Sequence, residues 1–317
     1  MRRLLPLFAL ALTPVLAAPA IAQSGGAFTI AETGESFATL EQALDAAKPR
    51  GEFTWSTILI APGVYRQCAV QSWGKTIFRA RQQGTVIFDG TACEGKAVLV
   101  LRGRGAEVDG IVFRNIRVPD GNGAGIRSEI GDLTVKNAMF LDSQEGILGG
   151  TSGQQRIIIE YSTFAGLGQC DETPDCAHSI YLANQGQITV RNNRFERGRG
   201  GHYVKVRIPR VEIIDNSFDD TRGRKTNYMI DLSEGATGVI AGNTFVQGLN
   251  KENHSALITV GPEARTYSST GLRIENNSAR LSPGDSRTPA FVADWSRQRL
   301  AIGANRLGPG IRPYEAR

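Results

Sequence analysis

The sequence predicts an all-β protein built as a solenoid, in which the chain coils repeatedly around one axis. A short pattern recurs: apolar residues in alternation, a polar stretch that often contains Asn, and then an aromatic or aliphatic residue. Its final residues, 23 to 34 positions apart, are Phe113, Phe140, Phe164, Phe195, Phe218, Phe245, Ala279 and Leu307. A variable period in this range, with strand-like patterning, is the sequence signature of a β-solenoid.

Each repeat also contains a second predicted strand. Segments such as 179–183, 203–207 and 229–233 alternate apolar and polar residues with the period of two that is typical of half-buried strands. Successive coils of a solenoid lie about 4.8 Å apart, so equivalent residues form ladders. A ladder of Asn side chains is expected at the bend, although turn propensity alone would also explain them; its members are Asn193, Asn216, Asn243, Asn277 and Asn305.

The first residues have the features of a cleaved signal peptide. Arg2 and Arg3 precede an apolar run, and an Ala-Ile-Ala cleavage motif ends at Ala22. We therefore expect residues 1–22 to be removed, and the mature protein to be periplasmic or secreted. No later segment is long and apolar enough to predict a transmembrane helix.

The remaining residues, 23–317, are predicted to form a single domain. Residues 30–55 are expected to be a cap, because 37–47 has helical periodicity and good helix formers. A cap covers the open end of a solenoid, where unpaired strand edges invite aggregation. The coils are expected over 56–307, followed by a tail at 308–317. The oligomeric state is not indicated by the sequence.

The four cysteines are compatible with an oxidising compartment. Cys170 and Cys176 bracket a short acidic loop that a disulfide could close. Cys68 and Cys93 are 25 residues apart, which is one coil, so they could meet on adjacent coils. This pairing is favoured among three possibilities. A zinc site is the alternative, but the close cysteine pairs and nearby His of such sites are missing.

The distribution of charge points to an anionic partner. The net charge is +5, and the segment 191–225 contains ten Lys or Arg against five Asp or Glu. Export disfavours nucleic acid, so an acidic polysaccharide is the better candidate. In the acidic loop, Asp171, Glu172 and Asp175 are candidate calcium ligands without a defined ligand spacing. No other metal or cofactor is indicated.

Several short motifs resemble the right-handed parallel β-helix superfamily, the pectin-lyase-like proteins. They are APGVY (61–65), NGAGIR (122–127), GIL (146–148), H-x-x-Y (178–181) and GHYVK (201–205). The similarity is greatest to a group of secreted bacterial β-helix repeat proteins without a settled activity. It implies a right-handed parallel β-helix with a short N-terminal capping helix. The functions it implies are polysaccharide lyase, hydrolase or epimerase activity, or non-catalytic binding.

The active-site signatures of that superfamily are incomplete in this chain. Arg207-Ile208-Pro209-Arg210 begins like the R-x-P-x-x-R stretch of pectate lyases, but Glu212 stands at the position of the second Arg. Asp219-Asp220 follows Gly201-His202, whereas the related hydrolases have the Asp pair first. The D-P-H-D stretch of the alginate epimerases does not occur.

Aligning the second strands places several chemically active side chains on neighbouring coils. The aligned candidates are His178, Tyr181, His202, Lys205, Arg207 and Asp231. This set suits β-elimination on a uronate polysaccharide, which needs a cation at the carboxylate, a base for the α-proton and an acid for the leaving oxygen.

We assign the roles as follows. Arg207 neutralises the carboxylate, Lys205 or His202 is the base, and Tyr181 or His178 is the acid. Asp231 orients Lys205. A C5-epimerase shares the first step, so the two activities are not distinguished. Additional substrate contacts are predicted for Arg127, Arg210 and Tyr203.

Structural explanations exist for the same residues. The histidines have the parity of inward residues and could serve as packed bend residues. Lys205 and Asp231 could form an ordinary surface ion pair, worth less than about 1 kcal/mol. The protein would then be a non-catalytic polysaccharide-binding or cell-envelope scaffold. That function predicts a buried His202 and a Lys205 engaged only with Asp231.

Overall fold

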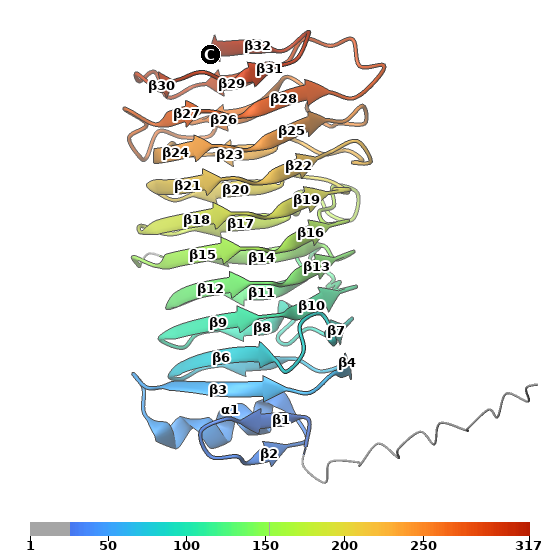
Figure 1. Ribbon diagram of the computed structural model, residues 1–317, viewed down its shortest axis with the longest axis vertical. Coiled ribbons are helices and arrows are strands. Elements are labelled where there is room, and N and C mark those ends of the chain that lie inside the picture. Colours follow the sequence, from blue (N-terminus) through green and yellow to red (C-terminus); the bar gives the residue numbers. More distant parts are fainter. Residues whose placement is uncertain (1–25, 152) are drawn as a thin grey trace, which may run out of the picture.

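The computed structural model describes residues 26–151 and 153–317. The predicted signal peptide, 1–22, lies outside these residues. The described chain forms a right-handed parallel β-helix of about nine turns, with one α-helix near its first turn (Figure 1). The predicted fold class is confirmed. No helix in the described residues has the length and apolar character needed to cross a membrane.

Each turn contributes one strand to each of three long sheets, which we call sheets A, B and C. Sheet A contains, in spatial order, β2 (Ser36–Phe37), β1 (Phe28–Ile30), β3 (Trp55–Ile60), β6 (Lys75–Ala80), β9 (Gly105–Asp109), β12 (Asp132–Lys136), β15 (Arg156–Glu160), β18 (Gln187–Arg191), β21 (Arg210–Ile214), β24 (Thr237–Ala241), β27 (Arg273–Glu275) and β30 (Ala301–Ile302). Apart from β1 and its two neighbours, adjacent strands are parallel.

Sheet B follows sheet A in each turn. It contains β4 (Gly63–Tyr65), β7 (Val86–Asp89), β10 (Ile111–Arg114), β13 (Met139–Leu141), β16 (Thr163–Ala165), β19 (Arg194–Glu196), β22 (Ser217–Asp219), β25 (Thr244–Gln247), β28 (Ser278–Leu281) and β31 (Arg306–Leu307).

Sheet C completes each turn. It contains β5 (Ala69–Gln71), β8 (Ala97–Leu101), β11 (Ala124–Ser128), β14 (Glu145–Gly150), β17 (Ile180–Ala183), β20 (Val204–Arg207), β23 (Ile230–Leu232), β26 (Ala256–Val260), β29 (Ala290–Asp294) and β32 (Arg312–Ala316).

The recurring sequence pattern therefore covers two strands, one of sheet A and one of sheet B, with a corner between them. The other strand predicted in each repeat belongs to sheet C. In residues 157–164, for example, Tyr161 has φ 51° between β15 and β16. A left-handed residue of this kind ends a strand and turns the chain. In the sequence both strands were treated as one recurring pattern, and the polar residues between them mark the corner.

The first turn is covered by α1 (Leu40–Ala47), which continues into a short 3-10 helix, η1 (Lys48–Arg50). The helix begins three residues later than predicted because Phe37 belongs to β2. Thr39 is the N-cap and forms a capping box with Gln42. The helix packs its apolar face on the end of the solenoid, with Leu40, Ala43, Leu44 and Ala47 buried.

The predicted Asn ladder is confirmed at the corner between sheets A and B. Asn193 donates from Nδ2 to Oδ1 of Asn216 at 3.1 Å, and Asn216 donates to Asn243 at 3.0 Å. The backbone N–H of each of these residues donates to the same amide oxygen of the next turn. The ladder continues through Asn277 to Asn305. Every amide in its buried part is hydrogen-bonded, which fixes the register of the turns.

A stack of aromatic rings fills the core beside this ladder. The rings of Phe113, Phe140, Phe164, Phe195, Phe218 and Phe245 lie at successive centroid distances of 5.1, 4.8, 4.9, 4.8 and 5.0 Å. The predicted alignment of the repeats is confirmed, because these residues are paired in the parallel register of sheet B.

Both predicted disulfides are confirmed, Cys68–Cys93 and Cys170–Cys176. Disulfides form and persist in oxidising compartments, which indicates a location outside the cytoplasm. The second bridge lies in the connection between sheets B and C, where the longer loops of the molecule gather.

We expect the Asn216→Ala substitution to lower the free energy of unfolding by about 2–6 kcal/mol. It leaves at least two buried donors of Asn193 without an acceptor, and each such group costs about 1–3 kcal/mol. Denaturant titration measures the effect. Asn305→Ala is the matched control at the end of the ladder, where water can replace the lost amide, so its effect should be smaller. Equal effects at the two positions would contradict a ladder that depends on burial.

Candidate functional site

The outward-facing side of sheet C has the register that the sequence predicts. The outward ladder runs through Arg127, Leu148, Tyr181, Lys205, Asp231 and Thr259, each paired with the next on adjacent strands. Arg207 lies two residues after Lys205 at the end of β20, beside Ala183. The structure therefore brings Tyr181, Lys205, Arg207 and Asp231 together.

The middle of this ladder is covered, although it faces away from the core. Lys205 is 7% exposed and Asp231 is 1% exposed. Glu263, in the segment 261–272 between β26 and β27, contributes to this cover through its contact with Lys205. The backbone N–H of Glu263 in that segment donates to the carbonyl oxygen of Ser233 at 3.0 Å.

Glu263 brings a carboxylate into contact with both cations of the site. Nζ of Lys205 contacts one of its oxygens, and Nη2 of Arg207 contacts the other. Nε of Arg207 also lies 3.1 Å from Oε1 of Glu234. Glu263 remains partly open to solvent, with its side chain 41% exposed. We call Tyr181, Lys205, Arg207, Asp231 and Glu263 the sheet C cluster.

Asp231 holds Lys205 from the opposite side. Its Oδ2 lies 3.3 Å from Nζ of Lys205 and accepts a hydrogen bond from the Ser233 hydroxyl at 2.8 Å. Its Oδ1 accepts from the Thr259 hydroxyl, also at 2.8 Å. Three donors therefore converge on the Asp231 carboxylate, which is placed to orient the ammonium group of Lys205.

The Tyr181 ring lies beside the two cations. The centre of the Arg207 guanidinium is 5.0 Å from the ring centroid, and Nζ of Lys205 is 5.7 Å from it. The edge of the ring also meets His178, with centroids 5.2 Å apart. Both cations are therefore within cation–π distance of one aromatic face.

The two histidines form a buried pair at the start of β17 and β20. Their ring centroids are 4.9 Å apart, and the backbone N–H of His202 donates to Nδ1 of His178 at 3.0 Å. Nε2 of His202 lies 3.6 Å from Oδ2 of Asp231. Burial lowers the pKa of both imidazoles well below the usual value, and the charge of Lys205 acts in the same direction. Both imidazoles are therefore neutral near pH 7.

Glu145, at the start of β14, continues this column of buried groups into the preceding turn. Its Oε1 accepts a hydrogen bond from the backbone N–H of His178 at 3.2 Å, and its Oε2 has no hydrogen-bond partner in the described chain. Burial raises the pKa of the carboxyl well above its usual value. Burial therefore extends the neutral acid to higher pH than for an exposed carboxyl.

Three residues predicted to contact substrate lie elsewhere or only at the margin. Tyr203 is 1% exposed and packs edge-on against the stacked rings of Phe195 and Phe218, so its prediction as a sugar contact is corrected. Arg210 belongs to β21 of sheet A, because the chain turns between the sheets after Arg207. Arg127 belongs to the same outward ladder of sheet C, and its Nε lies 3.9 Å from Oε1 of Glu129.

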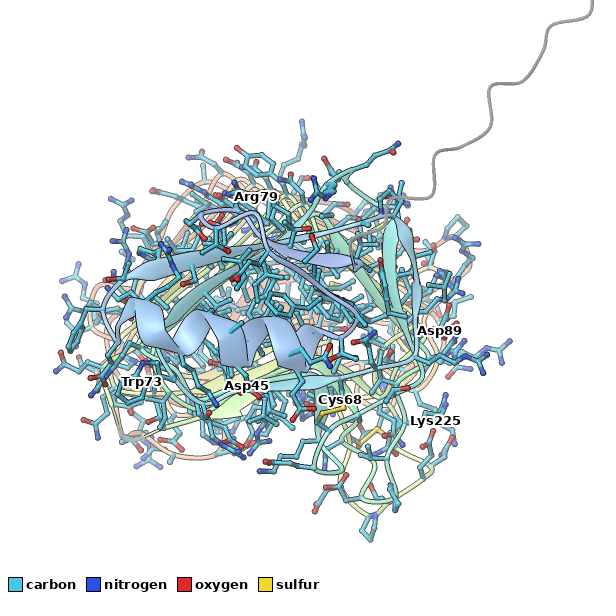
Figure 2. The ribbon with its side chains drawn as sticks, turned by 90° about the horizontal axis from the view of Figure 1, so that it is seen from below. Asp45, Cys68, Trp73, Arg79, Asp89 and Lys225 are labelled. Atoms are coloured by element: carbon cyan, nitrogen blue, oxygen red, sulfur yellow. A yellow bond between two sulfur atoms is a disulfide. The ribbon has the colours of Figure 1, made fainter. Side chains whose placement is uncertain are left out.

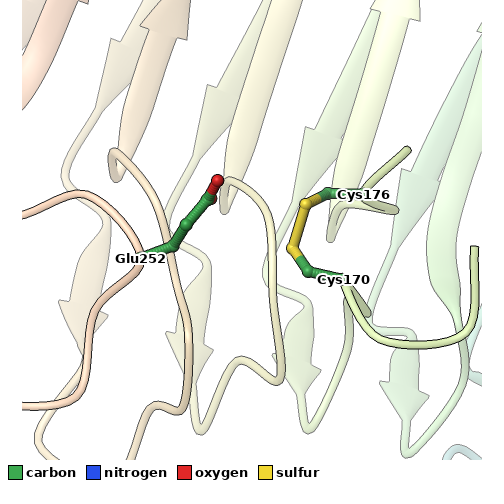
Figure 3. Close-up of side chains that lie close together, drawn as sticks. All are labelled: Cys170, Cys176 and Glu252. Atoms are coloured by element: carbon green, nitrogen blue, oxygen red, sulfur yellow. A yellow bond between two sulfur atoms is a disulfide. The ribbon is translucent and has the colours of Figure 1, made fainter. Parts of the chain in front are cut away.

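The acidic loop 170–176 does not present its carboxylates as one ion site. Asp171 pairs with Lys225, and Glu172 contacts Arg117 and Gln144. Across the described residues, the one group of three potential ligand side chains is Cys170, Cys176 and Glu252 (Figure 3). Both sulfurs are in the disulfide, so they offer no thiolate to a metal.

Two acidic residues near the cations were not predicted from the sequence. They are Glu263, a member of the sheet C cluster, and Glu234, which pairs with Arg207. Both residues lie in connections after strands of sheet C, outside the repeating pattern. An alignment of periodic strands gives positions for strand residues only. The negative charge of these two loop residues was the single sequence feature that could have suggested contact with Lys205 and Arg207.

We expect Glu145→Gln to raise the unfolding temperature at pH 7.5 by more than at pH 5. Folding raises the pKa of this carboxyl, so its contribution is most favourable below the unfolded value of about 4.5 and is lost as pH rises. Gln keeps the shape of the neutral acid without a proton to lose. Thermal unfolding at both pH values tests this, with Glu145→Ala as a control that should destabilise at both. A shift of equal size at the two pH values would contradict the raised pKa.

Comparison with known proteins supports the fold. No family model matches the chain, and no curated protein matches its sequence. The structure of Escherichia coli YbhC is 13% identical with a TM-score of 0.55; the alignment covers 94% of this chain and 88% of that one. ORF18 of Geobacillus virus E2 is 12% identical with a TM-score of 0.52, covering 87% of this chain and 56% of the other.

A third similar structure is the pectin methylesterase from Aspergillus niger, at 12% identity and a TM-score of 0.48, covering 87% of this chain and 90% of that one. At these identities the likeness concerns the fold and not the chemistry. The chain therefore shares the fold of YbhC and ORF18, and that fold is a right-handed parallel β-helix.

Proposed function

We propose that the protein binds an acidic polysaccharide over the outer face of sheet C, with Lys205 and Arg207 holding the carboxylate of a uronate residue. The observation that carries this proposal is the position of Glu263. Its two oxygens contact the two cations separately, as the carboxylate of a sugar acid would. Because Glu263 is partly exposed and comes from a connecting segment, a ligand carboxylate could replace it without rearranging the strands.

The surroundings of the cations favour a sugar as the ligand. Tyr181 is partly exposed on the same ladder, and aromatic rings are suitable surfaces for the apolar faces of sugar rings. Arg127 is two strands away from Tyr181, at about 10 Å, and supplies a further cation along the direction of the helix axis. A linear polyanion lying along the ladder would meet both cationic positions.

A second candidate function is β-elimination or C5 epimerisation at the same place. The observation that favours it is the neutral imidazole of His202, whose Nε2 lies 3.6 Å from the Asp231 carboxylate that holds Lys205. In both reactions Arg207 neutralises the sugar carboxylate, and Lys205 or His202 accepts the α-proton. In the elimination, Tyr181 or His178 then protonates the leaving oxygen, whereas in the epimerisation a proton returns to the opposite face of C5. Asp231 positions Lys205. The small exposure of His202 favours binding as the first candidate.

Substitution of Arg207 and Glu263 should affect the affinity for a uronate oligosaccharide in opposite directions. Arg207→Gln removes a charged hydrogen-bond donor and should raise the Kd for trigalacturonate about tenfold or more. Glu263→Gln removes the competing carboxylate charge and should lower the Kd. Isothermal titration calorimetry measures both.

Arg210→Gln is the matched control, because Arg210 is an exposed cation only three residues away on sheet A. It should leave the affinity unchanged. Loss of affinity in all three variants, or in the Arg210 variant alone, would show that the sugar does not use the sheet C cluster.

A lyase assay distinguishes catalysis from binding. The mature protein is incubated with polygalacturonate, alginate and hyaluronan, with and without calcium, and the absorbance of the unsaturated uronate is followed. Product that disappears in Lys205→Ala would establish a lyase at this site. Exchange of the sugar C5 proton with deuterated solvent, measured by NMR on the same substrates, would identify an epimerase. Binding with neither signal would assign the protein to the non-catalytic class.

A further inference from the structure

A basic pocket lies in the connections between sheets B and C, apart from the sheet C cluster. It has a volume of about 590 Å³, and its lining includes Arg117, Arg197, Arg199, Arg222, Arg224 and Lys225. We call these six residues and the space between them the basic loop pocket. In the view along the helix axis, the loops that carry Lys225 project from the cross-section at one corner (Figure 2).

The pocket concentrates positive charge. Its lining has six basic side chains against two acidic ones, Asp171 and Glu172, an excess of four that compares with a net charge of +5 for the whole chain. Arg197 lies 3.6 Å from Glu196 and 3.8 Å from Asp142, and Arg199 lies 2.9 Å from Asp142. Four of the six basic side chains therefore have a carboxylate partner among the described residues, and Arg222 and Arg224 supply the charge that is left unbalanced.

Two of the arginines have no carboxylate partner among the described residues. Arg117 contacts Glu172 and Lys225 contacts Asp171, but Arg222 and Arg224 form no ion pair with any described residue. Both are exposed at the mouth of the pocket. Guanidinium groups bind carboxylate, sulfate and phosphate oxygens through two parallel hydrogen bonds, so this pair is suited to an oxyanion.

The backbone that presents these arginines is held by a buried network. Asp220 is fully buried and accepts hydrogen bonds from the Tyr203 hydroxyl at 2.7 Å, from Thr226 at 2.9 Å and from Nζ of Lys251 at 3.0 Å. These contacts fix both ends of the segment 220–226. The backbone N–H of Arg224 also donates to the carbonyl oxygen of Gly198 at 2.8 Å. Such a segment loses little conformational entropy when a ligand binds.

The wall of the pocket formed by the loop 170–176 is also fixed by contacts within the protein. The Cys170–Cys176 disulfide closes the loop that carries Asp171 and Glu172. Gly168 and Gly200 let two connections pack backbone to backbone, since a Cβ at Gly168 would lie 2.0 Å from the Gly200 carbonyl oxygen. The backbone N–H of Gly201 donates to Sγ of Cys170 at 3.3 Å. The pocket is therefore built before any ligand arrives.

From this arrangement we infer that the basic loop pocket is a second binding site, which takes an anionic oligosaccharide segment through its sulfate or carboxylate groups. Its volume is in the range of small-ligand pockets, and its lining is polar and arginine-rich. Arg222 and Arg224 bind the oxyanion directly, and the paired cations add attraction at longer range. The site shares no lining residue with the sheet C cluster, so it can exist whether or not that cluster binds a uronate.

The test compares two double variants of the mature protein that remove the same charge. Arg222→Gln with Arg224→Gln alters the pocket, and Arg299→Gln with Arg306→Gln alters exposed arginines near the last turn. A heparin tetrasaccharide and tetragalacturonate are titrated separately by calorimetry, to distinguish sulfate from carboxylate recognition. Arg224→Glu serves as a second pocket variant, and unfolding temperatures are measured for all the proteins.

We expect at least one of the two oligosaccharides to bind the native protein, more weakly as salt concentration rises. The Kd should rise about tenfold or more in both pocket variants and stay unchanged in the control pair. Arg207→Gln, which alters only the sheet C cluster, should leave at least one binding event intact. The inference is overturned if neither oligosaccharide binds, or if the control pair weakens binding as much as the pocket variants.

Discussion

Backbone hydrogen bonding between successive turns at one fixed register is the constraint on which the rest of this molecule depends. In parallel strands a shift by one residue would turn inward side chains outward. The amides of Asn216, Asn243 and Asn277 oppose such a shift, because each accepts two hydrogen bonds from the Asn of the preceding turn. The adjacent phenylalanine stack requires the same register, so a polar ladder and an apolar column specify one alignment.

That alignment also determines the chemistry of the outer face. A fixed register places residues from sequence-distant turns about 4.8 Å apart, so a cation on one strand meets whatever side chain the next strand supplies. Lys205 meets Asp231 on one side and Tyr181 on the other. Lys205 and Asp231 can be buried on this face because their charges are paired, since a buried unpaired charge is strongly destabilising.

The connections between sheets B and C carry structural features that the regular coil does not have. Their lengths differ from turn to turn, so they project from the solenoid and carry the disulfide loop and the unpaired arginines. The Asp220 network links these connections to the core through Tyr203, whose ring packs against Phe195 and Phe218. A tyrosine that resembled a surface residue in the sequence thus connects the core to the loops.

The repeat pattern by itself indicated the fold class, the Cys68–Cys93 pairing, the Asn and Phe ladders and the neighbours of Lys205 on adjacent strands, because all of these follow from local periodicity and a constant rise per turn. Tertiary structure decided what periodicity does not encode. Tyr203 turned inward because the chain bends just before β20, and Arg210 moved to another sheet because a corner follows Arg207. Glu263 reached Lys205 and Arg207 from a non-repeating segment, 58 and 56 residues away in sequence. Contacts of that kind depend on how an irregular loop folds back over a sheet, which no pattern of residue spacing specifies.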